Sequence, residues 1–285
     1  MLAESPSARV AAESITSTQR VSFTFALTVC SRAIYLRDWL HGRIRMPKPQ
    51  PGVELTPLSI ASGNNRLQAL FAAPAGSSEK GRAAVLICHG IGEVVEQWAP
   101  IQQLLAAQGV ASLVFDYSGY GRSTGWPAAA QLEQDAIAAY TRLRELTSLP
   151  ISLLGFSLGT GAVAAILDRV PAHRLVLCAG FTSFRAAARR VGIPPFLTTF
   201  VPPIWNAEAP LRAATQPVLV VHSTRDRLFP IAMGKTLAAW CGPRARLRIV
   251  EGLRHTEPFS KPTADYWNPI AHFLTADESN ATEQA

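Results

Sequence analysis

One serine lies in a sequence context that is typical of a nucleophile. Residues 155–159 read Gly155-Phe156-Ser157-Leu158-Gly159. An apolar run at 151–154 precedes this pentapeptide and a helical pattern follows it, so Ser157 is expected at a turn between a strand and a helix. At such a turn the backbone is strained and the hydroxyl is held above the sheet edge. The two glycines avoid side-chain clashes there. The pattern indicates nucleophilic attack by Ser157 on an acyl carbon.

A serine nucleophile needs a histidine to take its proton and a carboxylate to orient that histidine. Asp226 follows a predicted strand, and His255 lies in a loop after the last predicted strand. This chain order of serine, acid and histidine is one in which such triads occur, so we predict these three residues as catalytic. The other interpretation of Asp226 is a surface ion pair with a neighbouring arginine. The remaining five histidines are placed less favourably: His41, His89, His173, His222 and His272.

Acyl transfer also needs N–H donors for the negative oxygen of the intermediate. The residue after the nucleophile, Leu158, is expected to supply one backbone N–H. Ile91 is expected to supply the second, because His89-Gly90-Ile91-Gly92 directly follows a buried strand. His89 itself is interpreted as a structural hydrogen-bonding group.

These residues require a sheet to position them. Short apolar runs separated by helical patterns predict an α/β fold with a mostly parallel, doubly wound central sheet of about eight strands. Helices are predicted at 98–108, at 128–146, after Ser157 and near the C-terminus. The strands are predicted at 55–61, 66–73, 83–88, 111–116, 151–155, 174–179, 217–222 and 247–250. Ligands of such sheets bind at the carboxyl ends of the strands, where every motif above lies.

Several acidic residues are interpreted as structural. Asp116 opens the glycine-rich stretch at 116–123 and is expected to support a loop. Four others lie in or beside helical patterns, where solvated faces or helix caps are the default: Glu93, Glu96, Glu133 and Asp135. No His/Cys cluster has metal-ligand spacing and no dinucleotide fingerprint follows a first strand, so we predict neither a metal nor a nucleotide cofactor.

The composition suits one α/β domain with appendages. The chain has 285 residues, of which 48% are hydrophobic and 16% charged, and its formal net charge is +7. The arginines are scattered and no aromatic-basic platform accompanies them, so nucleic-acid binding is not expected. The four cysteines are far apart in the sequence, and Cys88 and Cys178 are expected to be buried free thiols.

Residues 1–52 are predicted to be an N-terminal extension that is disordered over 1–18 and ends in a proline-rich linker. Its apolar stretch at 21–31 is too short to span a bilayer. A helix packed on the domain and an interfacial helix are equally compatible with it, and a signal peptide is less favoured. The first fifty residues carry seven cations and three acids, which suggests peripheral membrane contact. The protein is expected in the cytoplasm or peripherally at a membrane, with a disordered tail at 276–285.

Over residues 53–275 the chain resembles the α/β-hydrolase superfamily. It looks closest to the small-lid serine hydrolase branch, which includes serine-aminopeptidase-like hydrolases and membrane-associated protein depalmitoylases. The motifs are His89-Gly90, the stretch at 116–123, the pentapeptide around Ser157, Asp226 with Pro230, and His255. Two departures are present. His222-Ser223 replaces the His-Gly of many relatives, with little expected effect, and Ile91-Gly92-Glu93 lacks the asparagine of the depalmitoylases.

The resemblance implies a short lid at about 181–216. Its apolar residues suit either the lining of an acyl pocket or the packing of a helix. The function predicted is a carboxylesterase or thioesterase, most compatible with EC 3.1, that acts on a small or lipid-like substrate with an apolar acyl group. Two alternatives stay open. One is an aminopeptidase-like amidase in which Glu93 or Glu96 holds a free amine, and the other is a non-catalytic binding protein.

Overall fold

The computed structural model describes residues 36, 44–76 and 81–276. The predicted disordered segment at 1–18, the apolar stretch at 21–31 and most of the C-terminal tail lie outside these residues. Within the described part, the first strand begins at Val53 and the last helix ends at Thr275. No described helix is both long enough and apolar enough to cross a membrane.

Eight strands form a single sheet in the order β1-β2-β4-β3-β5-β6-β7-β8. Strands β3 to β8 are parallel, whereas β2 pairs antiparallel with both β1 and β4. The predicted mostly parallel sheet of about eight strands is therefore confirmed. The strands are β1 (Val53–Ser62), β2 (Asn65–Pro74), β3 (Ala83–Cys88), β4 (Val110–Phe115), β5 (Ile151–Phe156), β6 (Leu175–Cys178), β7 (Val218–Ser223) and β8 (Ala245–Val250).

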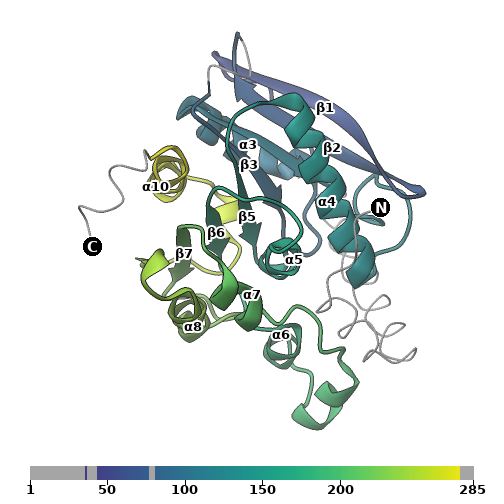
Figure 1. Cartoon of the computed structure of the whole chain (residues 1–285), viewed down its shortest axis with the longest axis vertical. Helices are drawn as coiled ribbons and strands as arrows, with labels where there is room; N and C mark the ends of the chain where they lie inside the picture. Colours follow the sequence, from purple (N-terminus) through teal and green to yellow (C-terminus); the bar gives the residue numbers. More distant parts are fainter. Residues whose placement is uncertain (1–35, 37–43, 77–80, 277–285) are drawn as a thin grey trace.

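The central strands are apolar because both faces of the sheet are covered. Every residue of β3, β4 and β5 is buried, as expected of a parallel sheet between helical layers. One face carries α3 (Val95–Ala107), α9 (Glu257–Ser260) and α10 (Ala264–Thr275). The other carries α4 (Ala129–Leu146), α5 (Leu158–Ile166) and α8 (Ile231–Cys241), with the short η3 (Gly242–Arg244) after α8. Figure 1 shows α10 and α4 on opposite sides of the strands.

The helix predicted at 98–108 begins three residues earlier, at Val95. Its N-cap residue, Val94, has no side chain that can accept a hydrogen bond from the first turn. Asp116, from another part of the chain, caps the helix instead, since its carboxylate accepts a hydrogen bond from the Val95 N–H at 2.9 Å. A helix start that is set by a distant loop leaves no signal in the local sequence.

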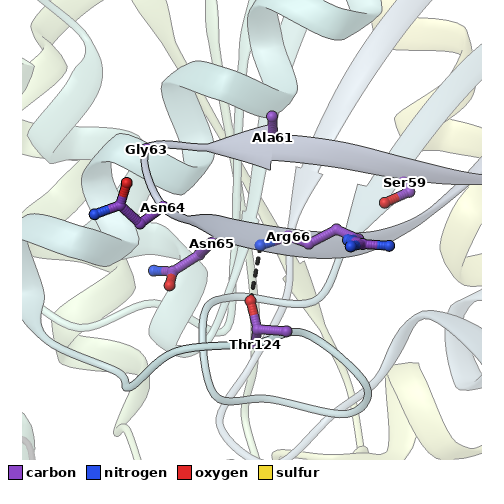
Figure 2. Close-up of a pocket in the computed structure, with 7 residues that line it drawn as sticks. All are labelled: Ser59, Ala61, Gly63, Asn64, Asn65, Arg66 and Thr124. Atoms are coloured by element: carbon purple, nitrogen blue, oxygen red, sulfur yellow. Dashed lines mark hydrogen bonds between the residues drawn. The ribbon is translucent and has the colours of Figure 1, made fainter.

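The β1–β2 hairpin borders an open hollow (Figure 2). The Arg66 N–H donates to Thr124 Oγ1 at 2.8 Å, which joins the hairpin to the loop after β4. The hollow is lined by Ser59, Ala61, Gly63, Asn64, Asn65, Arg66 and Thr124. None of the predicted catalytic or oxyanion residues lines it.

The lid lies between β6 and β7 and consists of α6 (Phe184–Arg190), η2 (Pro195–Phe200) and α7 (Glu208–Ala213). Its apolar residues divide into two groups. Ile204, Trp205 and Leu211 are buried in the cluster under α4 and α5, so the packing interpretation holds for this second part. Phe196 and Phe200 of the first part are exposed. In Figure 1, α6 and the turn after it protrude at the foot of the molecule.

We expect the two parts of the lid to respond differently to truncation. The buried Trp205 indole lies 6.0 Å from the Phe184 ring and donates to Glu133 at 3.1 Å. Trp205→Ala should lower the free energy of unfolding by about 3–5 kcal/mol, because it leaves a cavity and an unpaired carboxylate oxygen. Phe196→Ala should change it by less than about 0.5 kcal/mol, because that side chain is solvated. Urea unfolding of both variants tests the difference, and equal losses would contradict it.

Candidate active site

Ser157 lies between β5 and α5 in a backbone conformation that L-residues rarely adopt. Its φ of 51° and ψ of −114° place it outside the ordinary regions. The turn is held on both sides. The Ser157 N–H donates to the Cys178 carbonyl at 3.0 Å, and the Ser157 carbonyl accepts from the Thr160 N–H and hydroxyl. Such strain persists only where the surrounding structure enforces it, which is common at functional sites.

The flanking glycines are required by backbone contacts. A Cβ on Gly159 would lie 1.7 Å from the Cys88 carbonyl oxygen, which ends β3. A Cβ on Gly155 would lie 2.6 Å from the Gly159 carbonyl oxygen. The Gly-x-Ser-x-Gly spacing therefore lets the first turn of α5 lie directly against β3 and β5.

The structure brings Ser157, His255 and Asp226 together. Ser157 Oγ lies 2.8 Å from His255 Nε2, and His255 Nδ1 lies 2.7 Å from Asp226 Oδ2. Asp226 is buried, whereas the side chains of Arg225 and Arg227 are exposed. Among the described residues, the ion pairs of Asp226 are with His255 and His222. The alternative of a surface ion pair with an adjacent arginine is therefore wrong.

The acid is fixed by its own loop. Asp226 Oδ1 accepts hydrogen bonds from the N–H groups of Leu228 and Phe229, at 2.9 and 2.8 Å. This leaves Oδ2 directed at the imidazole of His255. The Phe229 ring stands perpendicular to that imidazole, with centroids 5.0 Å apart. The carboxylate and the histidine ring are both held in one orientation.

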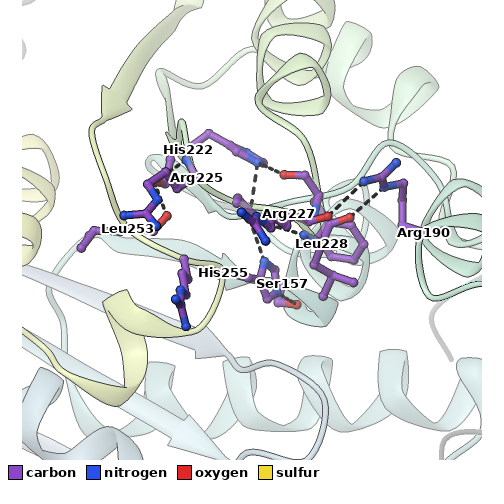
Figure 3. A network of polar contacts seen from close by, with 12 residues as sticks. Ser157, Arg190, His222, Arg225, Arg227, Leu228, Leu253 and His255 are labelled. Carbon is purple, nitrogen blue, oxygen red and sulfur yellow. Dashed lines mark hydrogen bonds and ion pairs between the residues drawn. The ribbon is translucent and has the colours of Figure 1, made fainter.

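His222 braces this loop. Its Nε2–H donates to the Phe229 carbonyl at 2.7 Å, and Nε2 lies 3.6 Å from Asp226 Oδ2. Burial lowers the pKa of His222, so the ring is neutral near pH 7. His222 was not predicted to be the base, and its contacts with Phe229 and Asp226 make it a support of this loop; Figure 3 shows His222 in the polar network.

Ser223 has a larger part than its sequence context suggested. The Ser223 hydroxyl donates to the Leu253 carbonyl at 2.5 Å. Leu253 lies two residues before His255, so this bond joins the loop of the acid to the loop of the base. A glycine at this position, as in many relatives, would lack the bond. The expectation that the change from glycine matters little overlooks this link.

Glu93 shapes the loop that carries Ile91. Its Oε2 accepts hydrogen bonds from the Gly90 N–H at 2.7 Å and from the Trp98 indole at 3.0 Å. Burial raises the pKa of Glu93 to about 8, an effect that these two donors partly oppose. The interpretation of Glu93 as a solvated or capping group is therefore wrong, because the side chain is buried against the loop that follows β3.

The stretch at 116–123 is a supporting loop, as predicted for Asp116. Burial, with the nearby Glu96 carboxylate second, holds the pKa of Asp116 well above its usual range. A Cβ on Gly121 would lie 2.0 Å from Asp116 Oδ2, so the loop wraps closely around this side chain. His89 Nε2 lies 3.8 Å away from Asp116 Oδ1, and burial lowers the pKa of His89 to about 4. His89 is thus a neutral structural group.

The remaining acids are also engaged. Glu96 is buried and pairs with Arg122, and Glu133 accepts hydrogen bonds from Arg169 and Trp205. Asp135 is fully buried and accepts bonds from the Ser62 hydroxyl and the Ser118 N–H, at 2.6 and 2.7 Å. A solvated face was the wrong interpretation for Glu96 and Asp135, because each carboxylate joins α3 or α4 to a distant loop.

Comparisons with known proteins agree with this geometry. A family model described as serine aminopeptidase, S33, matches residues 79–206. An uncharacterized protein of Mycobacterium tuberculosis is 29% identical over 197 residues, which cover 67% of this chain and 69% of that protein. The human alpha/beta hydrolase domain-containing protein 17C is 27% identical over 227 residues, which cover 78% of this chain and 66% of that protein.

Solved structures show the same architecture. An esterase of Pyrococcus furiosus superposes with a TM-score of 0.64 at 18% identity, covering 81% of this chain and 96% of that one. The chain therefore has the α/β-hydrolase fold. The esterase domain of a Rhodothermus marinus protein is a further α/β-hydrolase neighbour, with a TM-score of 0.61 at 19% identity over 78% of this chain and 97% of that one. At these identities the solved structures establish the fold of this chain and leave its activity and substrate undefined.

The contact between Gly159 and β3 predicts a severe effect of one added methyl group. Gly159→Ala should lower the free energy of unfolding by about 3 kcal/mol or more, because the Cβ would overlap the Cys88 carbonyl. Gly63→Ala is the matched control. This glycine has a φ of +55° with open space around it, so its cost should be about 1 kcal/mol from backbone strain alone. Equal losses of stability in the two variants would contradict the proposed contact.

The buried Glu93 carboxyl predicts a pH-dependent stability. Between its ordinary pKa of 4.5 and about 8, the folded protein retains a proton that the unfolded chain releases. Stability from this group therefore falls as pH rises through that range. Urea unfolding at a series of pH values should show that the wild type loses free energy of unfolding relative to Glu93→Gln as the pH rises. Because both proteins contain His89 and Asp116, their titration cancels in this difference. A difference that is constant with pH would contradict the prediction.

Proposed function

We propose that this protein is a serine hydrolase that cleaves a carboxylic ester or thioester with an apolar acyl group. One observation carries the proposal. Ser157 Oγ, His255 and Asp226 form a continuous hydrogen-bonded series with separations of 2.8 and 2.7 Å. The series begins at a strained turn at the end of β5, which is the arrangement that activates a serine hydroxyl.

In the first half of the proposed reaction, Ser157 Oγ attacks the carbonyl carbon while its proton passes to His255 Nε2. The ester or thioester bond then breaks, and His255 returns the proton to the departing alcohol or thiol. In the second half, a water molecule gives a proton to His255 and attacks the acyl-enzyme; the bond from the acyl carbon to Ser157 Oγ breaks, and His255 returns the proton to Oγ as the acid leaves. Asp226 keeps Nδ1 protonated throughout and stabilises the imidazolium that forms.

The backbone N–H groups of Ile91 and Leu158 are proposed to bind the oxygen that becomes negative in each half. Leu158 is the first residue of α5, so its N–H also lies at the positive end of a helix. Ile91 lies on the loop that Glu93 and Gly90 hold by their hydrogen bond. One donor of this kind typically contributes about 2.7–4 kcal/mol to stabilisation of the transition state.

An ester or thioester substrate is favoured over an aminoacyl substrate, because the two acids that could bind a free amine are buried and already paired. A pocket for a free amine would need an acid at the mouth, and Glu93 or Glu96 was the candidate. Both side chains are buried, with Glu93 bound to Gly90 and Trp98 and Glu96 paired with Arg122. The names of the structural relatives, esterases from two organisms, point the same way.

Peripheral membrane contact through the basic N-terminal region stays a prediction, because residues 1–35 and 37–43 lie outside the described part.

Labelling by a fluorophosphonate probe, together with hydrolysis of p-nitrophenyl esters of increasing acyl length, tests the proposal. Ser157→Ala should abolish labelling, and Ser157→Ala and His255→Ala should each lower kcat by at least about 10³-fold. Ser152→Ala is the matched control, since Ser152 is a buried serine on β5, just before Ser157, and has no hydrogen-bond partner among the described residues. It should keep both labelling and turnover.

Two results would overturn the proposal. Absence of labelling in the folded wild-type protein would favour a binding protein on a hydrolase fold. Turnover of aminoacyl-nitroanilides that exceeds turnover of every ester in the series would favour the amidase.

A further inference from the structure

The first part of the lid exposes an unusual concentration of apolar side chains. The described residues include eight large exposed hydrophobic side chains, and four of them fall between residues 191 and 200. We name these four the lid patch: Val191, Phe196, Leu197 and Phe200, which are 64%, 74%, 40% and 58% exposed. Exposed apolar groups scattered singly are ordinary, whereas a contiguous group on a protruding segment marks an interaction surface.

The lid patch rests on a fixed base. The Ser183 hydroxyl caps α6 by accepting from the Ala186 N–H, and Arg185 Nε donates to the Val201 carbonyl at 2.8 Å. Thr198, in the middle of η2, is buried, whereas Phe196, Leu197 and Phe200 of the same helix are exposed. The segment is therefore built to direct its apolar side chains outward, away from the core that receives Trp205.

Arginines flank the lid patch, and the first acid after it in the sequence, Glu208, pairs with Arg212. Residues 181–207 contain three arginines and no Asp or Glu. Arg189 and Arg190 are exposed in the last turn of α6, immediately before Val191. The loop that α6 contacts adds the exposed Arg225 and Arg227, while its one acid, Asp226, is buried against His255. Apolar tips beside cations match a membrane interface with anionic lipids.

The size of the lid patch favours a bilayer over a protein partner. A stable protein–protein interface takes roughly 20–30 residues from each side, with a polar rim that forms hydrogen bonds. Four side chains within ten residues are too few for this. They are enough for the boundary of a bilayer, where a few aromatic and aliphatic side chains insert below the headgroups and nearby arginines stay at the surface.

We propose that the lid patch, with Arg189 and Arg190, binds the surface of an anionic phospholipid bilayer through insertion of Phe196 and Phe200. The lid is also tied to the candidate active site. Arg190 donates to the carbonyl oxygens of Leu228 and Arg227, at 3.0 Å each, and Figure 3 shows this contact beside Ser157 and His255. Docking would therefore bring the loop that holds Asp226 toward the lipid. Only this last step rests on the proposed hydrolase function.

Vesicle co-sedimentation of the full chain tests the proposal. The wild type should bind vesicles of phosphatidylcholine mixed with phosphatidylglycerol, and the double variant Phe196→Ser/Phe200→Ser should bind them on the order of tenfold more weakly. Arg189→Gln should weaken binding to these vesicles by about fivefold and leave binding to pure phosphatidylcholine unchanged. Ile249→Thr, which changes an exposed apolar residue on β8, is the matched control and should bind as the wild type does.

Folding of each variant is checked by its thermal unfolding midpoint, which should equal that of the wild type. Three outcomes overturn the proposal. One is a wild type that does not bind the mixed vesicles. Another is a double variant that binds them fully, which would assign binding to the basic N-terminal region. The third is a double variant that differs from the wild type only in self-association, which would indicate a second copy of this chain as the partner. Ser157→Ala should bind vesicles normally, so failure of the hydrolase proposal and failure of this one are distinguishable.

Discussion

The close approach of α5 to the end of β3 is the contact on which the candidate site depends. With only hydrogen on its Cα, Gly159 lets the first turn of the helix lie against the Cys88 carbonyl. The chain must then reverse sharply within one residue, and Ser157 adopts the strained backbone conformation, with a φ of 51°. The same contact brings the nucleophile beside the loop after β3, which carries Ile91. One backbone contact thus sets the positions of the serine and of the proposed oxyanion donors together.

The other half of the site is held by hydrogen bonds within the Asp226 loop and between that loop and distant segments. Ser223 binds Leu253, His222 binds Phe229, and Arg190 binds the carbonyls of residues 227 and 228. Each bond has a main-chain carbonyl as its acceptor. Side chains that bind main-chain carbonyls in this way hold the loops in a fixed relative position. The Asp226–His255 distance is therefore a property of several loops and of the lid.

Local patterns were enough to predict the strands and to select Ser157, Asp226 and His255, which the structure brings together, because each of these follows from an apolar run and from what ends it. The same patterns misplaced the carboxylates. Asp135 lies in a helical sequence context, where exposure is the default, yet its partners Ser62 and Ser118 come from distant parts of the chain. The start of α3 was missed for the same reason, since its cap is Asp116. A partner that is brought close by the sheet has no signature in the flanking residues.

The protonation of Glu93 connects this buried network to the proposed chemistry. A carboxylate beside the oxyanion loop would oppose the negative oxygen that forms when Ser157 attacks, since like charges at short range interact strongly where water is excluded. Burial raises the pKa of Glu93 to about 8, which keeps the group mostly neutral at pH 7. The side chain can then accept hydrogen bonds from Gly90 and Trp98 and hold the loop without adding a negative charge. Burial of an acid, which costs stability as pH rises, is thus compatible with the electrostatics that a serine hydrolase requires.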